Sequence, residues 1–278
     1  MFGKTGQVAT ELSRFDGVTC LKRTDADLKD PGACEVAIAQ SAATAVINAA
    51  AYTAVDKAED DRDTATIINA MAPTAMAAAC AARNIPFVQI STDYVFDGSS
   101  EQPWRPTDPT EPLGVYGQSK LGGERGVSVA GGTHVILRTS WVFSAHGNNF
   151  VKTMLRLGVE REALNIVGDQ IGGPTPARDI ARACMKIAEQ LRMDPAKSGT
   201  YHFSGTPEVS WADFACEIFS QAGMSVTVTD IPTKEYPTPA QRPLNSRLDS
   251  SATAATFGIV QPDWRIGLKD VLTDLQRA

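Results

Sequence analysis

Short apolar runs alternate with longer amphipathic stretches through the first half of the chain. The apolar runs are rich in β-branched and aromatic residues, which favour buried strands, and they lie at residues 18–21, 44–51, 86–96 and 134–143. The stretches between them have helical periodicity and lie at residues 7–14, 32–41, 65–83 and 119–128. Because strands that alternate with helices of this length form parallel βαβ units, the pattern predicts an open, doubly wound α/β sheet.

The second half is less regular and predicts a smaller lobe on top of this sheet. Strands are predicted at residues 164–167 and 201–204, and helices at 177–191, 210–222 and 267–276. Ser210 and Asp213 have the spacing of a capping box that starts a helix, while residues 231–243 contain four prolines and predict a loop. We therefore expect one unit formed by residues 1–146 plus 163–205, and a smaller C-terminal lobe formed by residues 147–162 plus 206–278.

Composition and charge narrow the class of protein. Of the 278 residues, 43% are hydrophobic and 21% are charged, which excludes disordered, collagen-like and coiled-coil classes. The net charge of −6 argues against a general nucleic-acid-binding surface. The most apolar stretch, residues 67–82, is interrupted by Asn69, Pro73 and Thr74, so we interpret it as a buried helix and not as a membrane span. With no secretory signal visible, we expect a cytoplasmic protein without nucleic-acid or membrane partners.

The cysteines and histidines give no pattern of a metal site. Five cysteines are scattered singly along the chain, and the three histidines are far apart in sequence. This spacing is typical of a protein from a reducing compartment and predicts neither a disulfide framework nor bound metal.

A glycine-rich turn opens the chain. Gly3, Gly6 and Ala9 have the spacing G-x-x-G-x-x-A, in which glycines let the backbone approach a pyrophosphate and the next helix presents free N–H groups to it. Such a turn normally follows the central strand of the sheet, yet only Met1 and Phe2 precede it. We therefore expect that the first strand is truncated and that the natural start lies upstream.

Two cations follow the predicted strand at residues 18–21, where an acidic residue would normally bind the ribose 2′-hydroxyl group. Lys22 and Arg23 at this position favour a 2′-phosphate, and hence NADPH over NADH, although both side chains could equally face solvent. Asp27 lies close enough along the chain to contact the adenosine side of such a cofactor.

The pair Tyr116 and Lys120 is the main candidate for catalysis. Residues four apart lie on one face of a helix, so the phenol and the ammonium group would point into the same space. A nearby cation lowers the phenol pKa from about 10, and it can also hold the nicotinamide ribose. Upstream of this pair, Thr92 lies in Ser91-Thr92-Asp93 at the end of a predicted strand. Its hydroxyl group there could polarise a substrate carbonyl group.

With these motifs the chain resembles the extended short-chain dehydrogenase/reductase superfamily, which has a Rossmann-type fold, and within it the dTDP-4-dehydrorhamnose reductases. The matching stretches are GKTGQV (3–8), NAAAYTAVDKAE (48–59), STDYVFDG (91–98), YGQSKLGGE (116–124), RTSWVF (138–143), GNNFVKTMLR (147–156), DQIGGPT (169–175) and PTPAQRPLNSRLD (237–249). They cover nearly the whole chain.

The resemblance implies a role for each matching residue. The catalytic residues would be Thr92, Tyr116 and Lys120. The cofactor would be lined by Gly6, Gln7, Val8, Asp27, Leu28, Ala50, Ala51, Tyr52 and Thr53, together with Tyr116 and Lys120. The sugar nucleotide would contact Thr92, Asp93 and Trp141, and Arg156 and Arg242 are weaker candidates for its diphosphate. The larger unit would then be the dinucleotide-binding domain, and the lobe would bind the sugar nucleotide.

The implied reaction is the NADPH-dependent reduction of the C4 keto group of dTDP-4-dehydro-β-L-rhamnose, in the biosynthesis of cell-surface polysaccharide. Two alternatives stay open. One is another nucleotide-sugar reductase or epimerase of the same fold, and the other is a non-catalytic regulatory subunit similar to the β subunit of methionine adenosyltransferase.

Some members of the family dimerise through a magnesium ion that is held by glutamates. Glu11 matches one such ligand, but Arg178 stands at another ligand position, and a cation there opposes metal binding. We therefore expect no bound metal, and a monomer or weak homodimer.

Overall fold

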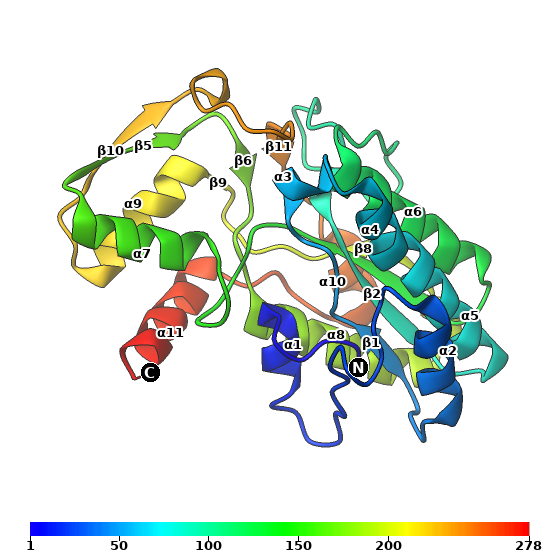
Figure 1. The fold of residues 1–278 in the computed structure, drawn as a ribbon. Helices are drawn as coiled ribbons and strands as arrows, with labels where there is room; N and C mark the ends of the chain where they lie inside the picture. The colour runs from blue at the N-terminus through cyan, green and yellow to red at the C-terminus, as the bar shows by residue number, and fades with distance from the viewer. Residues whose placement is uncertain (278) are drawn as a thin grey trace.

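The computed structural model, which describes residues 1–277, has a parallel sheet at its centre (Figure 1). Its four strands lie in the order β1 (Val46–Asn48), β2 (Phe87–Thr92), β3 (His134–Thr139) and β8 (Gly199–His202). Each neighbouring pair is parallel. The doubly wound α/β prediction is therefore confirmed.

Residues 1–3 take the place of a further strand beside β1. Phe2 forms parallel bridges both to Leu21 on one side and to Asn48 on the other, and its side chain is only 1% exposed. Its N–H group donates to Ile47 O at 3.0 Å, and Ala49 N donates to Phe2 O at 3.1 Å. The apolar run at residues 18–21 contributes a single bridge at Leu21 instead of a strand. The strand order thus reverses at Phe2, directly before the glycine turn.

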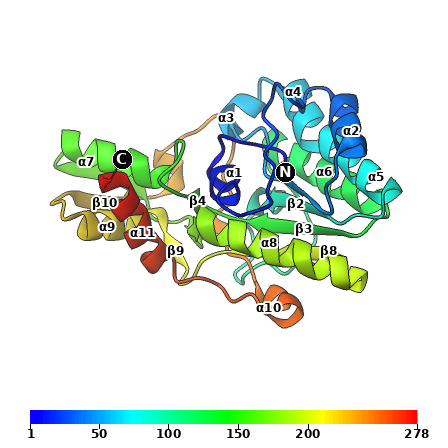
Figure 2. The same cartoon turned by 90° about the horizontal axis from the view of Figure 1, so that it is seen from below.

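Helices cover both faces of the sheet (Figures 1 and 2). One face carries α1 (Gln7–Leu12) and α8 (Ala177–Met193), and the other carries α2 (Pro31–Gln40), α5 (Ala72–Ala82) and α6 (Val115–Val129). Adjacent residues of β2 show the division, because Val88 packs in the core beneath α8 whereas Phe87 packs in the core beneath α5. The connecting elements are α3 (Val55–Ala58), α4 (Arg62–Thr66), the π-helical turn η1 (Ile67–Met71) and the 3-10 helices η2 (Asp93–Val95) and η3 (Pro195–Lys197).

The helical segments α4, η1 and α5 are continuous from Arg62 to Ala82. By length and composition alone, these 21 residues could cross a membrane. The helix also starts at Arg62, earlier than the residue 65 expected from the sequence. In this fold the helix packs against α2 and α6, and Ile68, Ala72 and Met76 belong to the core. The segment therefore serves as a packed helix of the sheet layer.

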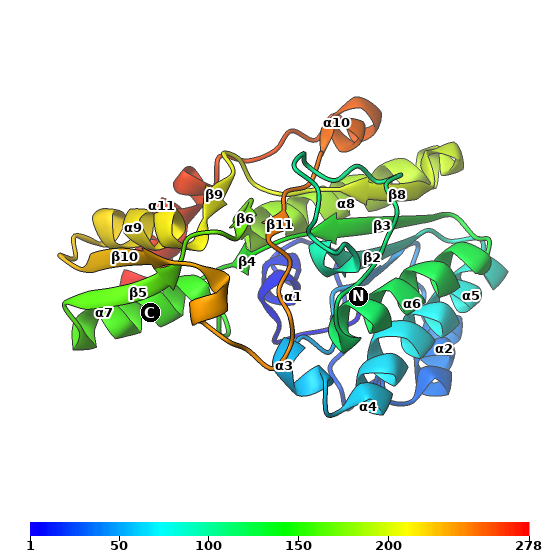
Figure 3. The same cartoon turned by 90° about the horizontal axis from the view of Figure 1, so that it is seen from above.

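A second group of elements lies to one side of the sheet (Figures 1 and 3). It contains α7 (Phe150–Glu160), α9 (Trp211–Ala222), α11 (Trp264–Gln276), and the parallel pair β5 (Ala163–Val167) and β10 (Thr227–Ile231). They share an apolar core that includes Met154, Phe214 and Trp264. The capping box at Ser210 and Asp213 is confirmed. Our division placed β5 with the sheet and β10 in the lobe, but the two strands pair, so any division has to keep them together.

Short elements connect the two groups. They are β4 (Val142–Phe143), β6 (Ile171–Gly172), β7 (Thr175–Pro176), β9 (Val209–Ser210), β11 (Asn245–Ser246), the 3-10 helix η4 (Thr233–Glu235) and α10 (Ser251–Phe257). β11 pairs with β6 in parallel, which brings the C-terminal part of the chain back to the edge where the central strands end.

Candidate active site

The glycine turn lies at the carboxyl edge of the sheet and has the geometry of a phosphate-binding loop. Gly3 has φ +103°, and a Cβ atom there would lie 3.3 Å from Ala9 Cβ and 3.4 Å from the backbone of Ala49. The helix α1 starts after Gly6, which offers no side chain to cap it, and residues 4–6 are exposed. The N–H groups of the first turn are therefore open to an anion, and the residues here fit a dinucleotide pyrophosphate.

The segment that follows β1, residues 50–53, is fixed by a buried asparagine that sequence reasoning missed. Asn69 accepts a hydrogen bond from Tyr52 N at 2.8 Å and donates to Tyr52 O at 3.0 Å. Its amide also donates to Ser119 Oγ on α6 at 3.0 Å. Asn69 thus ties the predicted cofactor segment to the helix of Tyr116. The signal in the sequence that could have identified Asn69 is a polar residue inside an apolar helix, which the sequence analysis treats only as an interruption of the apolar stretch.

Two glycines let α6 approach the sheet closely. A Cβ atom at Gly117 would lie 2.2 Å from Tyr94 O in η2, and one at Gly123 would lie 2.1 Å from Asn69 O in η1. Neither side chain could exist without moving the backbone. The close approach places the Tyr116 ring in edge-to-face contact with Tyr94, with the ring centroids 5.5 Å apart.

The structure brings Thr92 and Tyr116 together. Thr92 is the last residue of β2, and its hydroxyl group accepts a hydrogen bond from Tyr94 N at 3.2 Å. Burial raises the pKa of Tyr116 to about 12, and a side-chain hydrogen bond with Thr92 acts in the opposite direction. A threonine hydroxyl group and a protonated phenol therefore stand side by side at the end of the strand.

Lys120 lies one helical turn further along α6 and is buried. Its Nζ atom donates to Ile90 O at 2.7 Å. Burial lowers the pKa of Lys120 to about 8, and the charge of Glu124 opposes this shift. Our prediction that the lysine lowers the phenol pKa is wrong for the protein alone. Loss of solvent dominates the pKa of Tyr116, and sequence reasoning had considered charge only.

Asp93 adds a buried acid beside Thr92. Its Oδ1 atom accepts a hydrogen bond from Thr92 Oγ1 at 3.0 Å. Burial raises the pKa of Asp93 to about 6, against the hydroxyl groups of Ser246 and Thr92, which lower it. Among residues 1–277, Asp93 Oδ2 and the neighbouring Thr139 Oγ1 are buried without a hydrogen-bond partner. Unsatisfied polar atoms at this edge fit a polar ligand such as a sugar.

Trp141 follows the end of β3 and is held rigidly. Its φ of +48° is unusual for a bulky residue, and its indole stacks on Trp211 with ring centroids 3.5 Å apart. A Cβ atom at Gly172 would lie 2.6 Å from the same indole. Trp211, from α9, is a second contribution that sequence reasoning missed, because no local pattern links positions so far apart.

The remaining predicted residues divide into two groups. Lys22 and Arg23 are exposed directly after the Leu21 bridge, and Asp27 Oδ1 accepts a hydrogen bond from the backbone of Lys29, whereas Leu28 belongs to the core. Arg156 forms an exposed ion pair with Glu160, and both residues lie on α7, whereas Tyr116 lies on α6.

Arg242, in contrast, lies near Tyr116. It pairs with Asp56 at 2.8 Å and stands 6.0 Å from the centre of the Tyr94 ring. Its Nη1 atom is buried and has no hydrogen-bond partner among residues 1–277. The structure thus separates the two candidate arginines: Arg242 lies at the site and Arg156 on the surface.

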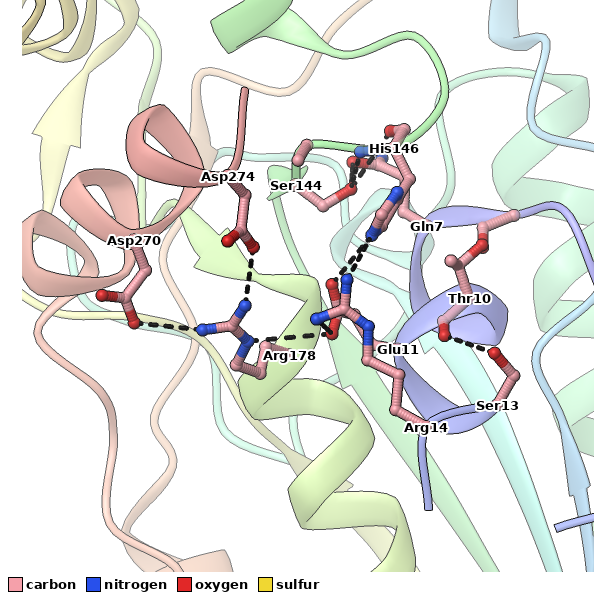
Figure 4. Close-up of polar contacts among 12 residues, drawn as sticks. Gln7, Thr10, Glu11, Ser13, Arg14, Ser144, His146, Arg178, Asp270 and Asp274 are labelled. Carbon is pink, nitrogen blue, oxygen red and sulfur yellow. Dashed lines mark hydrogen bonds and ion pairs between the residues drawn. The ribbon is translucent and has the colours of Figure 1, made fainter. Parts of the chain in front are cut away.

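Glu11 and Arg178 meet in an ionic cluster that joins α1, α8 and α11 (Figure 4). The Arg178 guanidinium lies 2.8 Å from Asp274, 3.3 Å from Asp270 and 3.7 Å from buried Glu11. His146 also contacts Glu11 at 3.2 Å. Because a guanidinium already pairs with these carboxylates, a magnesium ion would have to displace Arg178, and the residues present do not fit one.

Known proteins match the chain over nearly its whole length. The profile of the family described as RmlD substrate binding domain matches residues 1–277. A dTDP-4-dehydrorhamnose reductase of Sinorhizobium fredii is 44% identical over 272 residues, which cover 94% of this chain and 92% of the relative.

Solved structures agree. A dTDP-4-dehydrorhamnose reductase from Clostridium acetobutylicum has a TM-score of 0.92 at 38% identity and covers 99% of this chain and 98% of its own. A dTDP-4-dehydrorhamnose reductase from Bacillus anthracis, in complex with NADP, has a TM-score of 0.91 at 34% identity. The match covers 98% of this chain and 97% of that one. By sequence and by fold, the chain belongs to the RmlD substrate binding domain family, together with these dTDP-4-dehydrorhamnose reductases.

Proposed function

We propose that the chain reduces dTDP-4-dehydro-β-L-rhamnose to dTDP-β-L-rhamnose with NADPH, in the synthesis of cell-surface polysaccharide. The relatives that match it over nearly their whole length are named as dTDP-4-dehydrorhamnose reductases, and one of the matching structures holds NADP. The observation that carries the proposal is the convergence of α6 on the end of β2, where the Tyr116 ring contacts Tyr94, Lys120 donates to Ile90 O, and Thr92 ends the strand.

The cofactor would lie across the carboxyl edge of the sheet. The pyrophosphate would bind at the glycine turn with Gly6, Gln7 and Val8, and residues 50–53 would line its other side. When bound, NADPH supplies the hydride that reduces the keto group. Lys22 and Arg23 are exposed where a 2′-phosphate would lie, so their replacement by alanine should weaken binding of NADPH more than binding of NADH.

Tyr116 then acts as the proton donor. A phenol with a pKa of about 12 keeps its proton at neutral pH and gives it up only to a strongly basic oxygen, such as the alkoxide that forms at C4. Thr92, whose hydroxyl group donates to Asp93 Oδ1 in the chain alone, would turn that proton to the same oxygen and polarise the carbonyl group. Lys120, with its charge near the phenol, would hold the ribose hydroxyl groups.

The sugar nucleotide would be held by residues that reach the same edge from the lobe side. Asp93 would accept hydrogen bonds from sugar hydroxyl groups, and the fixed indole of Trp141 offers an apolar face. Arg242 would bind the diphosphate with its unpaired Nη1 atom. The sheet would thus bind the dinucleotide and the smaller lobe the sugar nucleotide, with β5 and β10 on the same side of the division.

We further propose a cytoplasmic monomer or weak homodimer. Cys20, Cys34, Cys80, Cys184 and Cys216 are free thiols, which suits a reducing compartment. The pairing of Arg178 with Glu11 and Asp274 supports association that does not use a metal bridge.

The test is a panel of nucleotide-sugar substrates, with turnover of each measured by the oxidation of NADPH. We expect turnover with dTDP-4-dehydro-β-L-rhamnose and formation of dTDP-β-L-rhamnose. Turnover with UDP- or GDP-linked keto sugars alone would assign the chain to another reductase or epimerase. Cofactor binding without turnover of any panel member would favour a regulatory subunit.

A further inference from the structure

A buried ionic cluster lies directly behind Lys120. Glu124, on α6, is 4% exposed, and Arg138, on β3, is 5% exposed. Arg138 donates two hydrogen bonds to the Glu124 carboxylate, from Nε to Oε1 at 3.0 Å and from Nη2 to Oε2 at 2.7 Å. The pair therefore has the bidentate geometry that gives the strongest charge-assisted hydrogen bonds.

The Glu124 carboxylate also contacts the strand that carries Thr92. Ser91, the preceding residue, donates its hydroxyl group to Glu124 Oε1 at 2.5 Å. Lys120 donates to Ile90 O, one residue earlier on the same strand. Two hydrogen bonds with one face of α6 thus fix the last residues of β2. In one, Lys120 donates to the strand, and in the other, Glu124 accepts from it.

Titratable and charged groups surround Lys120 on several elements. On α6 they are Tyr116 and Glu124, in η2 Asp93, on β3 Arg138, and on β8 His202, whose Nε2 atom lies 3.3 Å from Arg138. Burial and then the charge of Arg138 lower the pKa of His202 to about 3, so this imidazole is neutral. Glu124 is therefore the negative charge that acts on Lys120, and Arg138 is the positive charge paired with that carboxylate.

Fold stability alone is a weak reason for such a pair. A buried ion pair usually stabilises a protein little more than apolar residues of the same volume would. The contacts with Ser91 and the position one turn from Lys120 connect this pair instead to the predicted catalytic residues.

We propose that Glu124 is a positioning residue for the reduction proposed above: its carboxylate keeps Lys120 charged and, through Ser91, fixes the end of β2 that carries Thr92. Arg138 holds the carboxylate in place and limits the charge that Lys120 experiences. The inference rests on the proposed function, because it assigns Lys120 the task of binding the cofactor ribose.

Removal of either charge tests the proposal, because the two changes act on Lys120 in opposite directions. Glu124→Gln removes an attractive charge, so Lys120 loses its proton at lower pH. Arg138→Met removes a repulsive charge, so Lys120 keeps its proton to higher pH. A charge within about 4–6 Å shifts a pKa by about one unit or more. Glu124→Asp retains the charge and should leave the titration of Lys120 near its wild-type position.

The readout is the dissociation constant of NADPH, measured by fluorescence from about pH 6 to pH 10, beside the pH profile of kcat/KM. Wild-type binding should weaken as the pH rises through about 8, where Lys120 titrates. The midpoint should fall by about one pH unit in Glu124→Gln and rise in Arg138→Met. A wild-type affinity independent of pH, or midpoints that move in the same direction, would overturn the proposal, since a purely structural pair weakens both variants alike.

Ser91→Ala retains both charges and serves where a charge variant does not fold. It should lower kcat while the NADPH dissociation constant and its pH midpoint stay unchanged, and an unchanged kcat would contradict the role of Ser91. NADPH binding needs no sugar substrate. A chain that shows the opposite shifts but reduces no dTDP-sugar would therefore refute the proposed function and not the role of Glu124.

Discussion

The glycine next to Tyr116 controls how closely α6 can approach the end of β2, and Gly117→Ala is the sharpest perturbation of this contact. The added Cβ atom would lie 2.2 Å from Tyr94 O, whereas real Cβ atoms stay at least 3.0 Å from such a neighbour. The first turn of α6 and the η2 helix must therefore separate by about 0.8 Å. The neighbour is backbone, so no side-chain rotation can relieve the clash.

The separation has two calculable consequences. Overpacking of this kind costs about 1–3 kcal/mol of folding free energy, from which the better helix propensity of alanine recovers about 1 kcal/mol. Because the same movement takes the Tyr116 phenol away from Thr92, catalysis should suffer more than stability. A displacement of about 1 Å in a reacting group costs about 100-fold in rate.

Urea unfolding and NADPH oxidation measure the two effects. Gly122→Ala is the matched control, because it lies on the same helix and its Cβ atom would meet only Ala70 Cβ, at 3.1 Å. We expect Gly117→Ala to lose up to about 2 kcal/mol of unfolding free energy and about 100-fold in kcat, while the control stays within about 1 kcal/mol and a few-fold in kcat. Wild-type kcat in Gly117→Ala would refute the argument that the close approach of α6 sets the catalytic geometry.

Three further predictions concern Tyr116, Asp93 and the ionic cluster of Arg178. Tyr116→Phe should lower kcat by about 10²–10⁴-fold and leave NADPH affinity nearly unchanged in a binding titration, because it removes the proton donor and little else; unchanged turnover would exclude Tyr116 from proton transfer. Asp93→Asn should raise the unfolding free energy by up to about 3 kcal/mol near pH 8 and by almost nothing near pH 4. The folded-state pKa of Asp93 is raised to about 6, so the wild-type chain loses stability as the pH rises through that value, and an equal change at both pH values in urea titrations would contradict this reasoning. EDTA or added magnesium should leave the midpoint of thermal unfolding unchanged, because Arg178 pairs with the carboxylates of Glu11, Asp270 and Asp274; a midpoint that rises with magnesium would show that a cation displaces the guanidinium.

The alternating apolar runs predicted the parallel sheet because buried strands need apolar residues on both faces. Phe87 and Val88 show this directly, since neighbouring residues of β2 pack into different cores. The spacing of Tyr116 and Lys120 predicted a shared helix for the same local reason, and both residues lie on α6. Signals within one turn or one strand were therefore sufficient for the fold class and for the candidate pair.

Other features depend on contacts between distant segments, which no local pattern contains. The sequence shows Asn69 and Pro73 only as interruptions of an apolar run, whereas the hydrogen bonds of Asn69 with Tyr52 and Ser119 exist only in the folded chain. The raised pKa of Tyr116 comes from burial by the folded chain. Likewise Ser246 approaches Asp93, and Trp211 stacks on Trp141, only because the C-terminal segments return to the sheet edge.

The central claim is that the Tyr116 phenol and the Thr92 hydroxyl group act on one oxygen atom of the sugar. A crystal structure of the chain with NADP and dTDP-β-L-rhamnose measures this directly. We expect the O4 atom of the sugar within hydrogen-bonding distance of both hydroxyl groups, with the nicotinamide facing C4. A sugar that binds elsewhere, or that contacts the phenol by neither O4 nor C4, would contradict it.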